Sequence, residues 1–386
     1  MDNEQRVFAA ACAGSLLFGM VMLSLGTVNS FLMQQLSLDA LTIGSLAALL
    51  PLGILIGSLV FGPAVDRYGY RLPFVAPLVL MAAGFELIAF SAWFALLQVA
   101  FFLIGLGGGI INGSTNALVA DISGGKRSAR LSLLGFFYGL GALGMPGLTA
   151  ALAGLISSTT VIAGIGAVVL LVAALFVFVE FPAPKHPQGF PLRQARALLR
   201  DAPLLVLASV LFFQSAMESM VNNWTALYLQ NSIGSTVEAS LAALTVFAGS
   251  LTVARLILGG LLRKVSSERV VTICYGLTFA GAILLLLHGS WLTALLAVVL
   301  LGAGLAPIFP VVFSYIGGLY PRLTGTAFGI ALVIALTGNM ALNYLVGVLW
   351  QAAGIGGFPL TFTACVVLGF ALFRTGLGRV PASART

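Results

Sequence analysis

Charged residues are scarce in this sequence. Only 8% of its 386 residues are charged, 18 basic and 11 acidic, whereas 60% are hydrophobic. Soluble domains have about 25% charged residues, so an ordinary soluble enzyme is excluded, and the hydrophobicity excludes a disordered chain. The net charge of +7 comes from few acids rather than from a basic stripe, so no nucleic-acid partner is expected. The composition predicts a protein that crosses a membrane several times.

Cysteine and histidine are scarce as well. The three cysteines, Cys12, Cys274 and Cys365, lie in apolar runs and lack the spacing of disulfides or metal sites. The glycine runs are not followed by the Lys-Ser/Thr of a phosphate-binding loop. No metal or cofactor is therefore expected. Because the sequence has no catalytic cluster and no soluble ligand-binding domain, neither a membrane-embedded enzyme nor a receptor is expected.

Long apolar runs make up most of the chain. Twelve of them have the length that a transmembrane helix needs. They lie near residues 8–30, 42–65, 72–93, 95–120, 131–155, 160–180, 203–229, 239–262, 270–288, 291–317, 325–350 and 357–375. The sequence predicts an all-α membrane protein with twelve transmembrane helices in two pseudo-symmetric six-helix bundles.

The basic residues indicate the orientation in the membrane. Seventeen of the 18 lie in alternate loops or at the two termini, and the intervening loops have none. By the positive-inside rule, both termini and the proline-rich loop 181–202 face the cytoplasm, in an inner or plasma membrane. That loop divides the chain into expected domains at 1–180 and 203–386. Duplicated halves with a substrate site near the midplane are typical of transporters.

The loop between the second and third segments carries a motif. It reads Gly62-Pro-Ala-Val-Asp66-Arg67-Tyr-Gly69-Tyr-Arg71. This resembles the signature loop of the major facilitator superfamily, G-x-x-x-D-R-x-G-R-[RK], to which Gly62, Asp66, Arg67, Gly69 and Arg71 correspond. Tyr70 stands where the motif has a basic residue.

We expect this loop to form a gating latch. The eleventh segment begins near Gly325, and its first amides carry a partial positive charge that Asp66 can bind. Asp121 ends the fourth segment, where an acid is unfavourable unless Arg71 or Arg130 pairs with it. The alternative is a plain basic turn that only fixes the topology.

Three further segments resemble the fucose/galactose/glucose:proton symporter branch of the superfamily. They are residues 212–228 with Glu218, Trp224 and Tyr228, residues 302–314 with Ala-Pro-Ile-Phe-Pro, and residues 136–146. The resemblance implies transport of a neutral sugar together with a proton. The acids that the fucose symporter carries in its first and fourth helices are absent here, so coupling must use another acid.

Glu218 is the candidate for proton coupling. An ionisable group at membrane depth is costly and is a functional candidate by default. Gln214, Glu218, Asn222 and Thr225 share one helical face, and burial favours the protonated carboxyl, which can then carry a proton. The alternative is a protonated Glu that bonds a neighbouring helix. Trp224 suits either stacking on a sugar or an interface, and Tyr228 is expected to be an interface anchor.

Amide side chains are the candidates for substrate binding, because they donate and accept hydrogen bonds as sugar hydroxyls do. The candidate substrate-binding residues are Gln214, Asn222, Asn223, Trp224, Asn112, Asn116, Asn339, Asn343 and Asn29. The alternative for the asparagines is hydrogen bonding between helices.

Two other ionisable residues lie inside apolar segments. Glu86 is in the third segment, which in this superfamily is scaffold, so a structural or near-surface role is expected. Arg255 either snorkels to the surface or pairs with Asp121 or Glu218, and the sequence leaves this open.

The resulting hypothesis is a monomeric secondary transporter in the lipid bilayer that takes up a small neutral solute, a hexose-like sugar, with protons. The alternatives are a proton-driven drug or metabolite exporter and an uncoupled sugar uniporter. Gly135, Gly139, Gly144 and Pro146 partly match the exporter motif of the fifth helix, but Met145 separates the last glycine from the proline.

Overall fold

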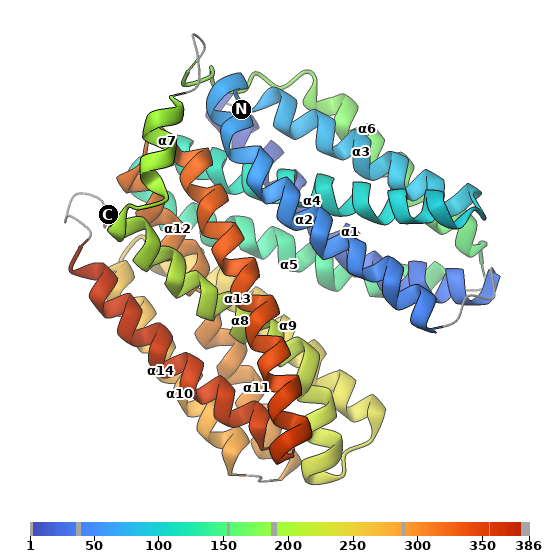
Figure 1. Cartoon of the computed structure of the whole chain (residues 1–386), viewed down its shortest axis with the longest axis vertical. Helices are drawn as coiled ribbons and strands as arrows, with labels where there is room; N and C mark the ends of the chain where they lie inside the picture. Colours follow the sequence, from blue (N-terminus) through green and yellow to red (C-terminus); the bar gives the residue numbers. More distant parts are fainter. Residues whose placement is uncertain are drawn as a thin grey trace. The chain divides into compact units, whose positions relative to one another are not determined.

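A computed structural model describes residues 3–35, 40–152, 155–186, 191–287, 290–354 and 356–379. The regular elements in these ranges are helices, which confirms the predicted all-α class (Figure 1). They are α1 (Asn3–Gln35), α2 (Ala40–Tyr68), α3 (Arg71–Phe90), α4 (Phe94–Ile122), η1 (Gly124–Lys126), α5 (Arg127–Leu152), α6 (Ser158–Phe176), α7 (Leu192–Leu198), α8 (Ala202–Ile233), α9 (Val237–Leu261), α10 (Ser267–Leu286), α11 (Trp291–Leu305), α12 (Ile308–Leu319), α13 (Thr324–Ala353) and α14 (Gly357–Leu377).

Eleven helical stretches within the described ranges are long and apolar enough to cross a membrane. Each coincides with one of the twelve predicted segments, and α5 covers the remaining one. Local signals set several boundaries. Asp201 caps α8 by accepting from the Leu204 amide, and Gly234 ends that helix with a positive φ of 66°, which glycine adopts without strain.

The segment predicted near residues 291–317 is not one regular helix. It consists of α11 and α12, which meet at Ala306 and Pro307. Proline has no amide hydrogen and its ring clashes with the carbonyl of residue i−4, so Pro307 interrupts the hydrogen-bond ladder. The stretch Trp291–Leu319 is still apolar and long enough to cross a membrane, so the predicted segment is confirmed, with a break at these two residues.

The chain forms two compact units, which are described separately. Unit 1 comprises Met1–Ile122, Phe137–Ala195 and Arg322–Gly329, and unit 2 comprises Ser123–Phe136, Arg196–Pro321 and Ile330–Thr386. The start of α5 therefore groups with the second half of the sequence, and the start of α13 groups with the first half. The domain boundaries expected from the sequence stay a prediction.

Unit 1 is built on close packing of α4 against α2 and α3, while α3 also lies beside α6 (Figure 1). A Cβ placed on Gly53 of α2 would lie 2.5 Å from the backbone oxygen of Phe102. Gly57, Gly105 and Gly109 make equally close backbone contacts along the same pair of helices. We call these four residues the glycine seam. Glycine is required there because any side chain would force α2 and α4 apart.

Unit 2 packs α8 against α9, α12 and α14, and α10 against α11 and α14 (Figure 1). Tyr228 of α8 is only 2% exposed. Its hydroxyl donates to the Leu285 oxygen of α10, and its ring meets Phe358 of α14 at 5.6 Å between centroids. The expectation that Tyr228 is an interface anchor was wrong, because its polar atom is bonded inside the unit.

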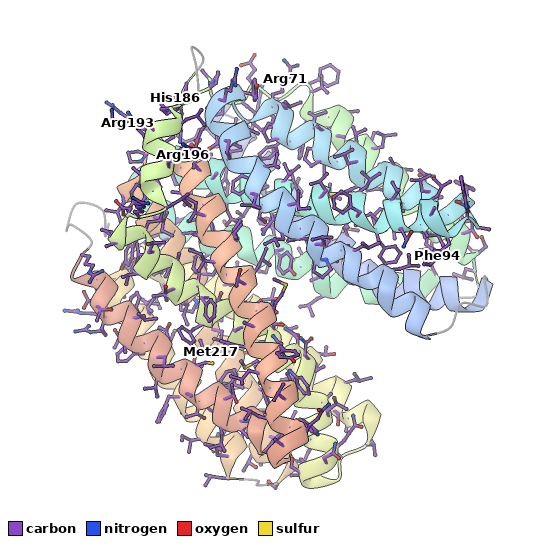
Figure 2. All side chains as sticks on the ribbon, viewed as in Figure 1. Arg71, Phe94, His186, Arg193, Arg196 and Met217 are labelled. Carbon is purple, nitrogen blue, oxygen red and sulfur yellow. The ribbon has the colours of Figure 1, made fainter. Side chains whose placement is uncertain are left out.

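The two ends of unit 1 differ in chemistry. Arg71 at the start of α3 and Phe94 at the start of α4 lie at opposite ends of the unit (Figure 2). His186 lies at the same end as Arg71 (Figure 2). We call this the basic end of unit 1.

Candidate functional site

The middle of α8 carries a charged and hydrogen-bonded group in unit 2. Glu218 Oε2 lies 3.5 Å from Arg255 Nη2 of α9 and accepts a hydrogen bond of 2.9 Å from Gln214 Nε2. The Glu218 side chain is 27% exposed, whereas that of Arg255 is 8% exposed. One carboxylate oxygen thus faces both groups while part of the side chain stays accessible.

The surroundings of Arg255 hold it in place. A Cβ placed on Gly135 of α5 would lie 2.9 Å from Arg255 Cδ, so the absent side chain at Gly135 leaves room for the arginine stem. Ser132 Oγ donates to the Arg255 backbone oxygen at 2.7 Å. Among the described residues, Arg255 Nε has no hydrogen-bond partner. Glu218 is therefore the anion that compensates the buried guanidinium. Of the alternatives that the sequence left open for Arg255, the structure has the pair with Glu218.

A network of amides lies on the next turns of α8 and on α13. Asn343 Oδ1 accepts from Asn223 Nδ2 at 3.1 Å and from Trp224 Nε1 at 3.0 Å. Asn343 Nδ2 donates to Ser219 Oγ at 3.1 Å and to the Asn339 backbone oxygen at 2.8 Å. We call Ser219, Asn223, Trp224, Asn339 and Asn343 the amide network.

One aromatic ring, Trp350, and one further amide, Asn222, border this network. Trp224 lies 5.4 Å from Trp350 between ring centroids. Asn222 is exposed and donates to the Glu218 backbone oxygen. Thr225, which the helical periodicity places on the same face, is fully buried instead. Exposed amides on an otherwise apolar transmembrane helix need water or a polar ligand beside them.

The amides of α4 use their hydrogen bonds differently. Asn116 Nδ2 donates to the Asn112 backbone oxygen at 2.8 Å and to its side-chain oxygen at 3.3 Å. Asn116 is buried, and Asn112 is partly buried. Asn116 therefore serves its own helix, while Asn112 remains a candidate for substrate contact. Asn29 lies outside the residues whose side chains the structure describes.

The predicted latch contact of Asp66 is present in unit 1. Asp66 is fully buried and accepts from the Gly325 amide at 3.2 Å, the Thr326 amide at 2.8 Å and Thr326 Oγ1 at 2.6 Å. A carboxylate at these amides is stabilised by the positive end of the α13 dipole. Gly62 permits the approach, because a Cβ at Gly62 would lie 2.4 Å from the Gly325 backbone oxygen.

The partners predicted for Asp121 need correction. Asp121 Oδ2 pairs with Lys185 Nζ at 2.7 Å and accepts a hydrogen bond from the Tyr70 hydroxyl. Arg71 instead donates to the Val177 backbone oxygen, because α6 ends beside the start of α3. Arg130 belongs to unit 2, so its predicted pairing stays a prediction.

Tyr70, the departure from the signature motif, has a definite structural role. It is buried, and burial raises its pKa well above the usual range, an effect that the neighbouring Asp121 carboxylate strengthens. Tyr70 thus remains a neutral donor at physiological pH. Arg67 is exposed and lies over the Tyr68 ring at 5.0 Å, and Gly69 makes the turn with a φ of 75°.

The comparison of sequence families decides the class of protein. The sequence profile of the Major Facilitator Superfamily matches residues 10–335. The chain belongs to the major facilitator superfamily. It is therefore a multi-pass membrane protein of a transporter family. No protein of curated function matches the sequence.

Solved structures of other facilitators share this fold. The fucose:proton symporter FucP of E. coli has a TM-score of 0.81 at 20% identity, over 96% of this chain and 98% of its own. The human organic anion transporter TETRAN has a TM-score of 0.78 at 18% identity, over 96% of this chain and 100% of its own. The proton:xylose symporter XylE has a TM-score of 0.76 at 15% identity, over 96% and 95%. At these identities the likeness concerns the facilitator fold.

Several contact residues of this facilitator were not predicted. Lys185 stands in the proline-rich loop, where the sequence offers only a positive charge, and Ser219 and Trp350 have no distinguishing motif. The position of Ser219 four residues before Asn223 was an available signal. Glu86 lies against α6, because a Cβ at Gly166 would lie 2.5 Å from its Oε1. This position suits the scaffold role expected for Glu86.

Proposed function

We propose that this facilitator is a secondary active transporter that moves a small neutral solute, a hexose-like sugar, by alternating access coupled to protons. The observation that carries the proposal is the Glu218–Arg255 pair beside the amide network on α8 and α13. The names of two solved neighbours, a fucose:proton and a proton:xylose symporter, support it.

Proton coupling follows from the chemistry of the pair. A proton that binds the Glu218 carboxylate removes its charge and weakens the ion pair with Arg255 and the hydrogen bond from Gln214. Arg255 then needs another acceptor, because an unpaired guanidinium in an apolar interior is costly. Protonation therefore favours a rearrangement around α8 and α9. The Glu218 side chain is 27% exposed, so the carboxyl is not sealed inside unit 2.

Substrate binding is assigned to the amide network and its neighbours Asn222 and Gln214. Amides can donate to and accept from vicinal hydroxyls, and Trp224 and Trp350 provide aromatic faces for the C–H surface of a sugar ring. No cation or anion is required of the ligand, which agrees with a neutral solute. Asn112 of α4 stays a separate candidate within unit 1.

The contact between Asp66 and α13 is assigned to the gate. Its three hydrogen bonds hold the start of α13 against α2, and alternating access requires that they break on opening towards the cytoplasm. The same proposal includes cytoplasmic termini, an inner or plasma membrane and a monomer in the bilayer.

The test is uptake of labelled hexoses by purified protein in liposomes under an inward proton gradient. The parent protein should accumulate at least one hexose. Glu218→Gln should abolish gradient-driven accumulation but leave counterflow exchange, because a neutral amide imitates the permanently protonated acid. The matched control is Glu86→Gln, which should accumulate as the parent does.

The other outcomes separate the alternatives. Exchange without accumulation in the parent protein would identify a uniporter, and accumulation driven by a sodium gradient would replace the proton as coupling ion. Efflux of organic compounds against a proton gradient, with no hexose uptake, would identify an exporter. Loss of accumulation in Glu86→Gln but not in Glu218→Gln would move the coupling site to α3.

A further inference from the structure

The segment between α6 and α7 makes side-chain contacts with three elements of unit 1. Its first residue, Phe181, packs on Phe74 of α3 with 4.7 Å between ring centroids. The chain then passes the turn between α2 and α3, where a Cβ on Gly69 would lie 3.3 Å from the Pro184 nitrogen. We call residues 181–186 the strap.

The end of the strap contacts both latch acids or their surroundings: Asp121 at the end of α4, and the place where Asp66 of α2 meets the start of α13. Lys185 Nζ lies 2.7 Å from Asp121 Oδ2, at the end of α4, and 3.0 Å from Thr324 Oγ1, at the start of α13. His186 adds two bonds, from its backbone amide to the Asp66 backbone oxygen at 3.1 Å and from Nε2 to the Arg322 oxygen at 2.9 Å. A single dipeptide thus contacts α2, α4 and the start of α13.

The charges explain why a cation is needed at this point. Two acids, Asp66 and Asp121, lie at the end of unit 1 that we call the basic end. Asp121 also lies beside the negative end of the α4 dipole, which disfavours its charge. The partial charge of the α13 amides compensates Asp66. Tyr70 gives Asp121 a hydrogen bond but no charge. The side chains of Lys185 and Asp121 are only 21% and 15% exposed, so their attraction is partly shielded from water.

We propose that Lys185 is a positioning residue of the gate, which supplies from the strap the positive charge that the signature loop lacks at Tyr70. The strap is then a moving part of the gate, because the Lys185–Thr324 bond must break whenever α13 leaves α2. This inference rests on the proposed alternating access and makes no use of the transported solute.

The test measures opening at the basic end without any substrate. Ser58 of α2 is 1% exposed, and a Cβ on Gly329 of α13 would lie 2.9 Å from its backbone oxygen. The thiol introduced by Ser58→Cys therefore reacts with a hydrophilic maleimide only when the start of α13 moves away. The native Cys12, Cys274 and Cys365 are buried, and protein without Ser58→Cys gives the background.

In lipid nanodiscs, Lys185→Ala should raise the labelling rate about fivefold, as expected for the loss of a partly screened ion pair. Lys185→Arg should label as the parent does, and so should Lys126→Ala, which removes an exposed lysine of η1. In the double variant Lys185→Ala/Tyr70→Arg, the rate should return towards that of the parent, because the cation is restored at the motif position.

Each result decides the proposal. An unchanged rate in Lys185→Ala, or an equal increase in Lys126→Ala, would overturn it. A double variant that labels as fast as Lys185→Ala would show that the missing cation is not the cause. Lys185→Gln serves as the second variant if Lys185→Ala does not elute as a single folded species. Failure of hexose uptake leaves these labelling rates, and therefore the inference, unaffected.

Discussion

Unit 1 and unit 2 compensate their buried acids in different ways. Asp66 of unit 1 lies at a helix N-terminus, where two backbone amides and one hydroxyl donate to it. Glu218 of unit 2 lies in the middle of α8, where the helical amides are already bonded, so it pairs with the Arg255 guanidinium and accepts a hydrogen bond from Gln214. Protonation of Glu218 would leave a buried guanidinium without its counter-charge, whereas the α13 amides that bind Asp66 carry only partial charges. This difference is the basis on which we propose gating for the Asp66 contact and proton coupling for Glu218.

The largest effect on stability is expected when the cation that faces Glu218 is removed. Arg255→Gln leaves a carboxylate without its cation and should lower the free energy of unfolding by about 2–3 kcal/mol, because Glu218 is only partly exposed. The double variant Arg255→Gln/Glu218→Gln should recover most of that loss. Thermal unfolding in detergent measures both. Equal destabilisation of the single and double variants would show that the two groups are not a coupled pair.

The next largest effect concerns the packing that keeps unit 1 rigid. Gly105→Ala places a methyl group against the Leu50 backbone oxygen in the glycine seam, and the enforced separation should cost about 2 kcal/mol. Gly249→Ala of α9, where a Cβ has open space, should be neutral or stabilising by up to about 1 kcal/mol. The same unfolding assay compares them. If Gly105→Ala were as stable as Gly249→Ala, the helices α2 and α4 would tolerate a side chain between them, and the glycine seam would not be a rigid contact.

The smallest effect should appear in substrate affinity. Asn343→Ala removes the acceptor shared by Asn223 and Trp224 and should raise the half-saturating solute concentration about fivefold, equivalent to the loss of about 1 kcal/mol of hydrogen bonding. Asn116→Ala, whose amide bonds its own helix, should change it less than twofold. Concentration-dependent counterflow measures both. A larger change in Asn116→Ala would place substrate binding on α4.

The apolar helices and the Asp66 contact were predictable because each follows from local rules. Length and hydropathy give the twelve segments, and the signature loop together with the direction of α13 places Asp66 at Gly325. The Glu218–Arg255 pair was harder. Counting about 1.5 Å per residue from the helix ends that the sequence predicts to be cytoplasmic gives depths of about 22 Å for Glu218 and 11 Å for Arg255, which does not indicate a pair. In the structure, Arg255 Nη2 nevertheless lies 3.5 Å from Glu218 Oε2.

Other features depend on packing that a single sequence does not contain. Tyr228 has the composition and position of an interface anchor, but its burial is decided by α10 and α14. Lys185 is one of several basic residues in a loop, and only the folded strap selects it. The break at Pro307 is different, since proline and its fixed geometry were visible in the sequence and argued against one regular helix.

The continuity of α13 has a mechanical consequence. The helix runs from Thr324 to Ala353, and its first six residues group with unit 1 while the remainder groups with unit 2. Gly325, which Asp66 caps, and Asn343, at the centre of the amide network, are joined by about 27 Å of the same helix. Because its backbone hydrogen bonds run without interruption, an α-helix moves along its axis as one rigid element. In the proposed transport cycle, an axial shift of α13 at Asn343 would therefore also move the amides that donate to Asp66, without a relay of side chains.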